Sequence, residues 1–114
     1  MSDIWYPLKN YEGLYEITKS GKIRRTPREL KTTKDAQGYQ VVQLRDCNGN
    51  IKNKKLHRLI AETFLENPEN KPCVDHINTV RTDNRVENLR WATYTENMNN
   101  PLTVEKLNQY RNAI

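Results

Sequence analysis

The stretch that decides the fold is residues 73–98, which read CVDHINTVRTDNRVENLRWATYTENM. Residues 73–77 predict a brief extended segment, residues 78–88 a polar loop, and Leu89–Thr93 a second strand. Thr95 is predicted to cap a helix that runs to the end of the stretch. The order strand, loop, strand, helix brings the helix back across the hairpin.

Polar side chains fall at the junctions of this stretch. Asp75 and His76 lie where the first strand meets the loop, Asn88 directly precedes the second strand, and Asn97 falls in the helix. The topology brings a carboxylate and an amide oxygen together beside an imidazole. Oxygen donors with open coordination positions suit Mg²⁺ or Mn²⁺ better than zinc. Because neighbours on a regular strand point to opposite faces, we expect the strand to end or twist between Asp75 and His76.

The residues before this stretch predict short strands and then one helix. The predicted strands, separated by turn signals such as Asn48–Gly49, are Leu14–Thr18, Lys22–Arg25, Gln40–Leu44 and Ile51–Leu56. A helix is predicted over residues 55–65, because apolar residues recur there at helical spacing before Asn67–Pro68. The expected fold class is α+β, with a small N-terminal antiparallel sheet and packed helix in residues 1–66. Residues 67–114 then form the metal-binding core and a C-terminal helix over Thr103–Arg111.

Composition restricts the class of protein further. The chain has 114 residues, 35% of them hydrophobic, and a formal net charge of +5. Residues 1–58 contain 13 basic and 6 acidic side chains, whereas the rest of the chain has a net charge of −2. A basic first half predicts a surface for a polyanion. The chain contains neither a membrane-spanning apolar run nor a signal peptide, and two distant cysteines predict free thiols, so we expect a cytoplasmic protein.

The sequence resembles the phage-type HNH homing endonucleases, which contain a ββα-metal core. The motifs that carry this resemblance are Val74–Ile77, Asp83–Asn84, Glu87–Thr93 and Glu96–Asn97 in the core, preceded by Trp5, Tyr11–Ile17, Ser20–Ile23, Gly38–Tyr39 and His57–Ala61. The last five resemble the small β-rich module that precedes the core in that family. The resemblance covers about residues 4–100, nearly the whole chain.

The resemblance implies a role for each polar residue of the core. Asp75 and Asn97 correspond to ligands of one divalent metal, Mg²⁺ or Mn²⁺. His76 corresponds to the general base that activates water, and Asn88 to the residue that fastens the loop and orients His76. One departure is Thr79, which stands where the family usually has glycine. Larger relatives also carry a C-terminal DNA-binding extension, so we expect modest sequence selectivity and leave open a homodimer or a partner protein.

Basic residues predict contacts with DNA. Two clusters lie in the first half and three further arginines lie near the loop of the core. The predicted DNA-binding residues are Lys22, Arg24, Arg25, Arg28, Lys31, Lys52, Lys54, Lys55, Arg58, Arg81, Arg85 and Arg90. Since Lys22 and Arg24 share one strand face and Arg25 takes the other, the first cluster does not contact DNA as a whole.

Plainer interpretations stand beside these. The Asp75–His76 pair is also compatible with a surface hydrogen bond, and Asn88 with a purely structural cap on the loop. His57 is a second candidate base, although its apolar neighbours favour a buried structural role. The alternative function is a non-catalytic nucleic-acid-binding protein on the same scaffold. A structural protein that binds an acidic partner is a third.

Overall fold

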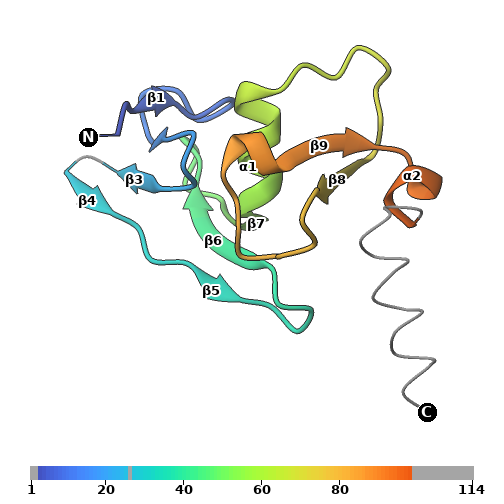
Figure 1. Ribbon diagram of the computed structural model, residues 1–114. Helices are drawn as coiled ribbons and strands as arrows, with labels where there is room; N and C mark the ends of the chain where they lie inside the picture. The colour runs from blue at the N-terminus through green and yellow to red at the C-terminus, as the bar shows by residue number, and fades with distance from the viewer. Residues whose placement is uncertain (1–2, 26, 99–114) are drawn as a thin grey trace.

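The chain forms three small antiparallel sheets around one helix in a computed structural model that describes residues 3–25 and 27–98 (Figure 1). The sheets have the orders β1-β2-β3-β4, β5-β6-β7 and β8-β9. The strands are β1 (Tyr6–Pro7), β2 (Glu16–Ile17), β3 (Ile23–Arg25), β4 (Arg28–Glu29), β5 (Thr33–Lys34), β6 (Gln40–Arg45), β7 (Ile51–Lys55), β8 (Cys73–His76) and β9 (Leu89–Ala92). The helices are α1 (Leu56–Phe64), the 3₁₀ helix η1 (Val86–Asn88) and α2 (Tyr94–Met98). The α+β prediction is confirmed.

The β6–β7 hairpin confirms the turn predicted at Asn48–Gly49. The Asp46 carboxylate accepts hydrogen bonds through Oδ1 from the backbone N–H groups of Asn48 and Asn50, both at 2.9 Å. Gly49 has a φ of +84°, which glycine adopts without a steric penalty. The turn is therefore specified locally, which is why the sequence alone predicts it.

Helix α1 packs on the strands through the apolar stripe that its sequence predicts. Leu56, Leu59 and Ile60 are buried, and the half-buried Phe64 meets the Tyr6 ring edge-on with centroids 5.2 Å apart. The helix contacts β6 and β7, which precede it in the sequence, and β8 and β9, which follow it. With nine residues α1 is the longest helix of the described part, and none of the helices there is long and apolar enough to cross a membrane.

One hydrophobic core holds both halves of the chain together. Its buried members are Leu8, Tyr15, Ile17, Ile23, Val42, Leu44, Leu56, Leu59, Ile60, Ala61, Val74 and Leu89. Val74 and Leu89 come from the β8–β9 hairpin and pack with side chains of the first half. The division into residues 1–66 and 67–114 stays a prediction, since both segments contribute to this core.

Three strands and one helix start differ from the sequence prediction. Strands β1, β4 and β5 were not predicted, because two residues are too few to show an alternating pattern. Thr95 lies inside α2, so its prediction as the cap is wrong. Thr93 caps the helix instead: its Oγ1 accepts from the Glu96 N–H at 3.1 Å, and Glu96 Oε1 accepts from the Thr93 N–H at 3.0 Å. The helix predicted over Thr103–Arg111 lies outside the described residues.

Candidate active site

The β8–β9 hairpin buries a carboxylate against a guanidinium. Asp75 lies directly opposite Arg90 in the strand pairing, and Arg90 Nε donates to Asp75 Oδ2 at 2.9 Å. The side chain of Asp75 is 7% exposed and that of Arg90 is 41% exposed. Arg90 also donates through Nη2 to the backbone carbonyl of Glu96 at 3.4 Å. The guanidinium therefore connects the buried carboxylate to helix α2.

His76 is buried beside two other rings. Its ring centroid lies 4.8 Å from that of His57 on α1 and 6.0 Å from that of Tyr39, which precedes β6. His76 Nε2 lies 2.7 Å from Oδ1 of the buried Asn84. The amide of Asn84 in turn donates through Nδ2 to Gln40 Oε1 at 2.6 Å. Packing and hydrogen bonding together fix the orientation of the imidazole.

Strand β8 does not end between Asp75 and His76, so the prediction that it ends there is wrong. The strand runs through His76, which pairs with Leu89, just as Asp75 pairs with Arg90. The two side chains contact different elements: Asp75 meets Arg90 on β9, and His76 meets His57 on α1. This is the alternation expected of neighbours on a regular strand. The carboxylate and the imidazole therefore lie next to each other in the chain while they face different surroundings.

His57 is held neutral by its surroundings. It is buried, and its ring also stacks on that of Tyr39 with centroids 5.0 Å apart. Burial lowers the pKa of His57 to about 3, and the neighbouring His76, Lys55 and Arg58 act in the same direction. A histidine that stays neutral and packed between rings supports the structural role that the apolar neighbours of His57 predict.

Asn88 fastens the loop between the two strands. Its Nδ2 donates to Asn78 Oδ1 and to the backbone carbonyl of Asp83, both at 2.9 Å. Its Oδ1 accepts from the Asn78 N–H at 3.1 Å. The Asp83 carboxylate pairs with Arg85 at 2.7 Å, and the Arg85 hydrogen bond holds the pKa of Asp83 well below its usual range. Asn88 thus joins both ends of the loop, whereas the direct contact with His76 belongs to Asn84.

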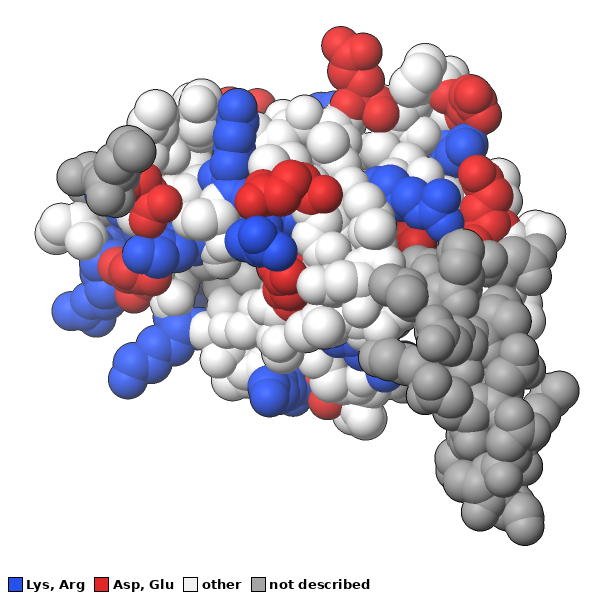
Figure 2. All heavy atoms as spheres, viewed as in Figure 1, with Lys and Arg blue, Asp and Glu red and all other residues white. Residues whose placement is uncertain are grey.

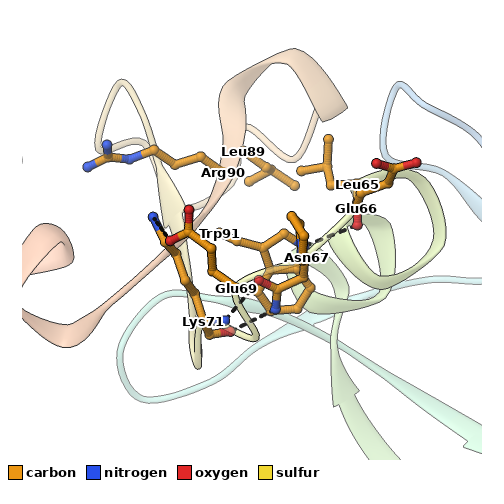
Figure 3. Close-up of a pocket in the computed structure, with 9 residues that line it drawn as sticks. Leu65, Glu66, Asn67, Glu69, Lys71, Leu89, Arg90 and Trp91 are labelled. Atoms are coloured by element: carbon orange, nitrogen blue, oxygen red, sulfur yellow. Dashed lines mark hydrogen bonds and ion pairs between the residues drawn. The ribbon is translucent and has the colours of Figure 1, made fainter.

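Asn97 lies half-buried on α2, which packs against β8 and β9. The Thr93–Glu96 capping box sets where this helix begins, and Lys71 Nζ pairs with Glu96 Oε1 at 2.9 Å. The same Lys71 lines a pocket with Arg90 and other residues of the hairpin and the preceding loop (Figure 3). Hydrogen bonds from Thr93 and Lys71 lower the pKa of Glu96 to about 2, so its carboxylate is charged. These contacts anchor α2 beside the strand that carries Asp75.

Asp75 and Asn97, the two predicted metal ligands, provide oxygen donors, which suit a hard divalent cation. Among the described residues, no group of three or more His, Cys, Asp and Glu side chains lies together. Asp75 and Asn97 offer one carboxylate and one amide oxygen, and Mg²⁺ commonly takes one or two protein carboxylates and fills its remaining positions with water and substrate phosphate. These oxygen donors therefore fit a hard divalent cation, and Arg90 already pairs with the Asp75 carboxylate.

Two family models match successive parts of the chain. The model described as HNH endonuclease matches residues 54–99, and the model described as NUMOD4 motif matches residues 3–45. The chain belongs to the HNH endonuclease family. The HNH segment begins near the end of β7 and contains all four residues that the sequence predicts for the catalytic centre, namely Asp75, His76, Asn88 and Asn97.

Similar HNH endonucleases are found in viruses of different hosts. Two proteins of Acanthamoeba polyphaga mimivirus, both described as uncharacterized HNH endonucleases, are 40% and 36% identical over 94 and 115 residues. They match 81% and 92% of this chain, which covers only 28% and 29% of their lengths. DNA endonuclease I-HmuI of Bacillus phage SP01 is 32% identical, with 91% of this chain and 60% of that protein covered. A solved structure described as DNA binding and cleavage by the HNH homing endonuclease I-HmuI matches with a TM-score of 0.75, over 94% of this chain and 65% of that one.

Sequence reasoning missed three residues around the HNH histidine. Asn84 and Tyr39 fall in motifs that carry the family resemblance, yet neither received a role, and Gln40 was placed only at the start of a strand. The contacts between Gln40 and Asn84 join positions 44 residues apart. No local pattern in the sequence reports such a contact. The structure places Asn84 and Tyr39 beside His76 and Gln40 beside Asn84. The side chain of Asn88 bonds instead to Asn78 and Asp83.

The predicted DNA-binding cations of this HNH protein fall into three groups. Six of them lie in ion pairs with acidic side chains, namely Lys22, Arg24, Lys55, Arg58, Arg85 and Arg90. Four are exposed or half-buried with no ion pair among the described residues, namely Arg28, Lys31, Lys52 and Lys54. Arg25 packs over the Tyr15 ring and Arg81 over the Tyr39 ring, at 6.0 and 4.9 Å from the centroids. Figure 2 shows basic side chains projecting from the edge that carries β3 and β4.

Proposed function

We propose that the chain is a divalent-metal-dependent endonuclease that hydrolyses DNA phosphodiester bonds, by nicking or by double-strand cleavage. The observation that carries the proposal is the buried His76, held by Asn84 and adjacent to the buried Asp75 on one strand of the HNH hairpin. The structural similarity to I-HmuI supports DNA as the substrate.

His76 is the proposed general base. A neutral imidazole accepts a proton from the attacking water, and its fixed orientation removes the cost of finding the reactive geometry. In an in-line displacement the attacking and leaving oxygens lie on opposite sides of phosphorus. Because His76 and Asp75 face different surroundings, the two groups are suited to act on opposite sides of one phosphate.

Asp75 and Asn97 are the proposed holders of the metal. The cation, Mg²⁺ or Mn²⁺, supplies neutralisation of phosphate charge and stabilisation of the departing 3′ oxygen. Arg90 pairs with the same carboxylate within the hairpin. Asn88 holds the loop closed by its hydrogen bonds to Asn78 and Asp83, so its role is to position the strand end that carries His76.

The proposed DNA-binding side chains differ in whether an ion pair within the protein already engages them. Cations without an ion pair in the described structure, such as Arg28 and Lys54, pair with phosphates without first breaking a protein contact. Lys22 and Arg24 must exchange Asp3 and Glu16 for DNA. Arg81 lies in the HNH loop and donates to the backbone carbonyl of Gln37, which suits a phosphate clamp near the scissile bond. We also propose that the protein acts in the cytoplasm of a bacterial host.

One observation favours a second candidate, a DNA-binding protein without cleavage. Arg90 engages one oxygen of the Asp75 carboxylate and so competes with a cation for it. The two functions separate in one experiment, in which the full chain is incubated with supercoiled plasmid with and without Mg²⁺ or Mn²⁺. Metal-dependent conversion to nicked or linear DNA supports the endonuclease. Salt-sensitive binding with intact plasmid under every metal supports the alternative.

A further inference from the structure

A chain of side-chain hydrogen bonds reaches the HNH histidine from the N-terminal module. Gln40 lies at the first position of β6, and its Oε1 accepts from Asn84 Nδ2 at 2.6 Å. Asn84 Oδ1 lies 2.7 Å from His76 Nε2. Asn84 and His76 are both buried, so each polar atom in this chain needs its partner.

The direction of the Gln40–Asn84 hydrogen bond decides the direction of the Asn84–His76 hydrogen bond. An amide side chain has one end that donates and one that accepts. Since Asn84 presents its NH₂ group to the carbonyl of Gln40, it presents its carbonyl oxygen to His76. A carbonyl oxygen only accepts, so His76 Nε2 must carry the proton. In a neutral imidazole the other ring nitrogen, Nδ1, then carries the lone pair.

Contacts with the N-terminal module hold Asn84 in this position. A Cβ on Gly21, which has a φ of +101°, would lie 3.3 Å from the Asn84 backbone oxygen, so the turn at Gly21 lies directly against Asn84. The Val86 N–H donates to the carbonyl of Lys19 at 2.8 Å and ties the same loop to the same turn. Arg81 donates to the carbonyl of Gln37, just before β6. The loop is therefore attached to the module on both sides of Asn84.

We infer that Gln40 is a positioning residue that acts through Asn84 to keep His76 in the Nε2–H tautomer, so that Nδ1 takes the proton of the attacking water. The inference rests on the proposed function for the role of Nδ1, whereas the tautomer itself does not depend on cleavage. It also means that the HNH core draws part of its catalytic geometry from outside its own segment. Removing the acceptor at position 40 removes the hydrogen bond that fixes which end of the Asn84 amide faces the ring.

The test compares two single variants, one with an acceptor and one with donors at position 40, and adds a double variant as a rescue. Gln40→Glu offers only an acceptor and preserves the relay. Gln40→Lys offers only donors, so Asn84 must turn its carbonyl toward position 40 and its NH₂ toward His76. Gln40→Lys combined with Asn84→Asp supplies a carboxylate that accepts from both sides and restores the original tautomer. Gln40 is partly exposed, and Asn84→Asp keeps the size of the buried side chain, so all three variants are expected to fold, which circular dichroism and thermal unfolding verify.

Long-range ¹H–¹⁵N NMR correlation of the ring nitrogens gives the tautomer directly, without substrate or metal. The chain has two histidines, and a His57→Gln variant assigns them. The wild type and Gln40→Glu are expected to show Nε2–H, Gln40→Lys Nδ1–H, and the double variant Nε2–H again. The cleavage rate kcat is expected to fall at least about tenfold in Gln40→Lys with KM unchanged, and to recover in the double variant.

The spectra separate failure of this inference from failure of the proposed function. Nδ1–H in the wild type, or an unchanged tautomer in Gln40→Lys, overturns the relay even if the protein cuts DNA. Tautomers that follow the variants in a protein that cuts no DNA support the relay and overturn the endonuclease. A cleavage loss in Gln40→Lys that the double variant does not recover, with tautomers as expected, overturns the assignment of Nδ1 as the proton acceptor.

Discussion

Replacing Thr79 with glycine is expected to stabilise the protein, because the native residue is strained in two ways. Thr79 has a φ of +64°, a left-handed conformation that costs a residue with a Cβ about 1–2 kcal/mol. Its Oγ1 hydroxyl is buried without a hydrogen-bond partner among the described residues, at a further cost of about 1–3 kcal/mol. Glycine loses more backbone entropy on folding, which lowers the gain by about 0.5–1 kcal/mol. The net gain in the free energy of unfolding is about 1–4 kcal/mol.

Urea and thermal unfolding measure this gain, and two variants separate its sources. A gain of 1 kcal/mol raises Tm by about 4 °C for a chain of this size. Thr79→Ala removes the hydroxyl but keeps a Cβ at the same φ, so its gain is expected to be smaller than that of Thr79→Gly. The Thr79 N–H donates to the His76 carbonyl at 2.9 Å, and neither substitution removes this backbone N–H, so the turn after β8 is expected to persist. A Tm below that of the wild type in Thr79→Gly would refute the reasoning about strain.

Three further outcomes test other parts of the molecule. Asp75→Ala and Asn97→Ala are each expected to abolish cleavage at saturating metal. Circular dichroism is expected to show that both variants stay folded. Cleavage at the wild-type rate in either variant would show that the replaced residue is not a metal ligand. Arg28→Gln combined with Lys31→Gln is expected to weaken DNA binding on all sequences and to lower the slope of log affinity against log salt by about 1.8, and an unchanged slope in binding titrations would place both side chains away from phosphates. The pKa of His57, about 3, lies below its ordinary value of about 6.5, so the unfolded chain takes up this proton first as the pH falls, and stability is lost below about pH 6.5. Between pH 7 and pH 5 the free energy of unfolding of the wild type, measured with urea, is therefore expected to fall by about 2 kcal/mol more than that of His57→Gln. An equal fall in both proteins would contradict the buried neutral ring.

The parts of the fold that the sequence predicts are those with local signals. The β6–β7 turn depends on Asp46, Asn48 and Asn50, all within five residues, and α1 depends on a stripe of four apolar residues. The capping box of α2 was also local, since Glu96 follows Thr93 at the capping-box spacing, yet Thr95 was chosen in its place. The sequence is ambiguous here because a second threonine, Thr95, lies two residues after the capping Thr93 and inside the helix.

The parts that the sequence did not predict depend on distant contacts. The partner of His76 is Asn84, and the partner of Asn84 is Gln40, which belongs to a different sheet. The Asp75–Arg90 ion pair needs the exact strand register, which a twelve-residue loop does not specify. Tertiary packing therefore decides how the catalytic side chains are surrounded, while their presence and order are evident from the sequence.

The single-turnover rate of His76→Ala on duplex DNA tests the central claim most directly. The account predicts that the wild type cuts in the presence of Mg²⁺ or Mn²⁺ and that His76→Ala cuts at least about a hundredfold more slowly. DNA affinity, measured in parallel, is expected to stay the same, because the base acts on water and not on substrate binding. Cleavage by His76→Ala at the wild-type rate would contradict the account.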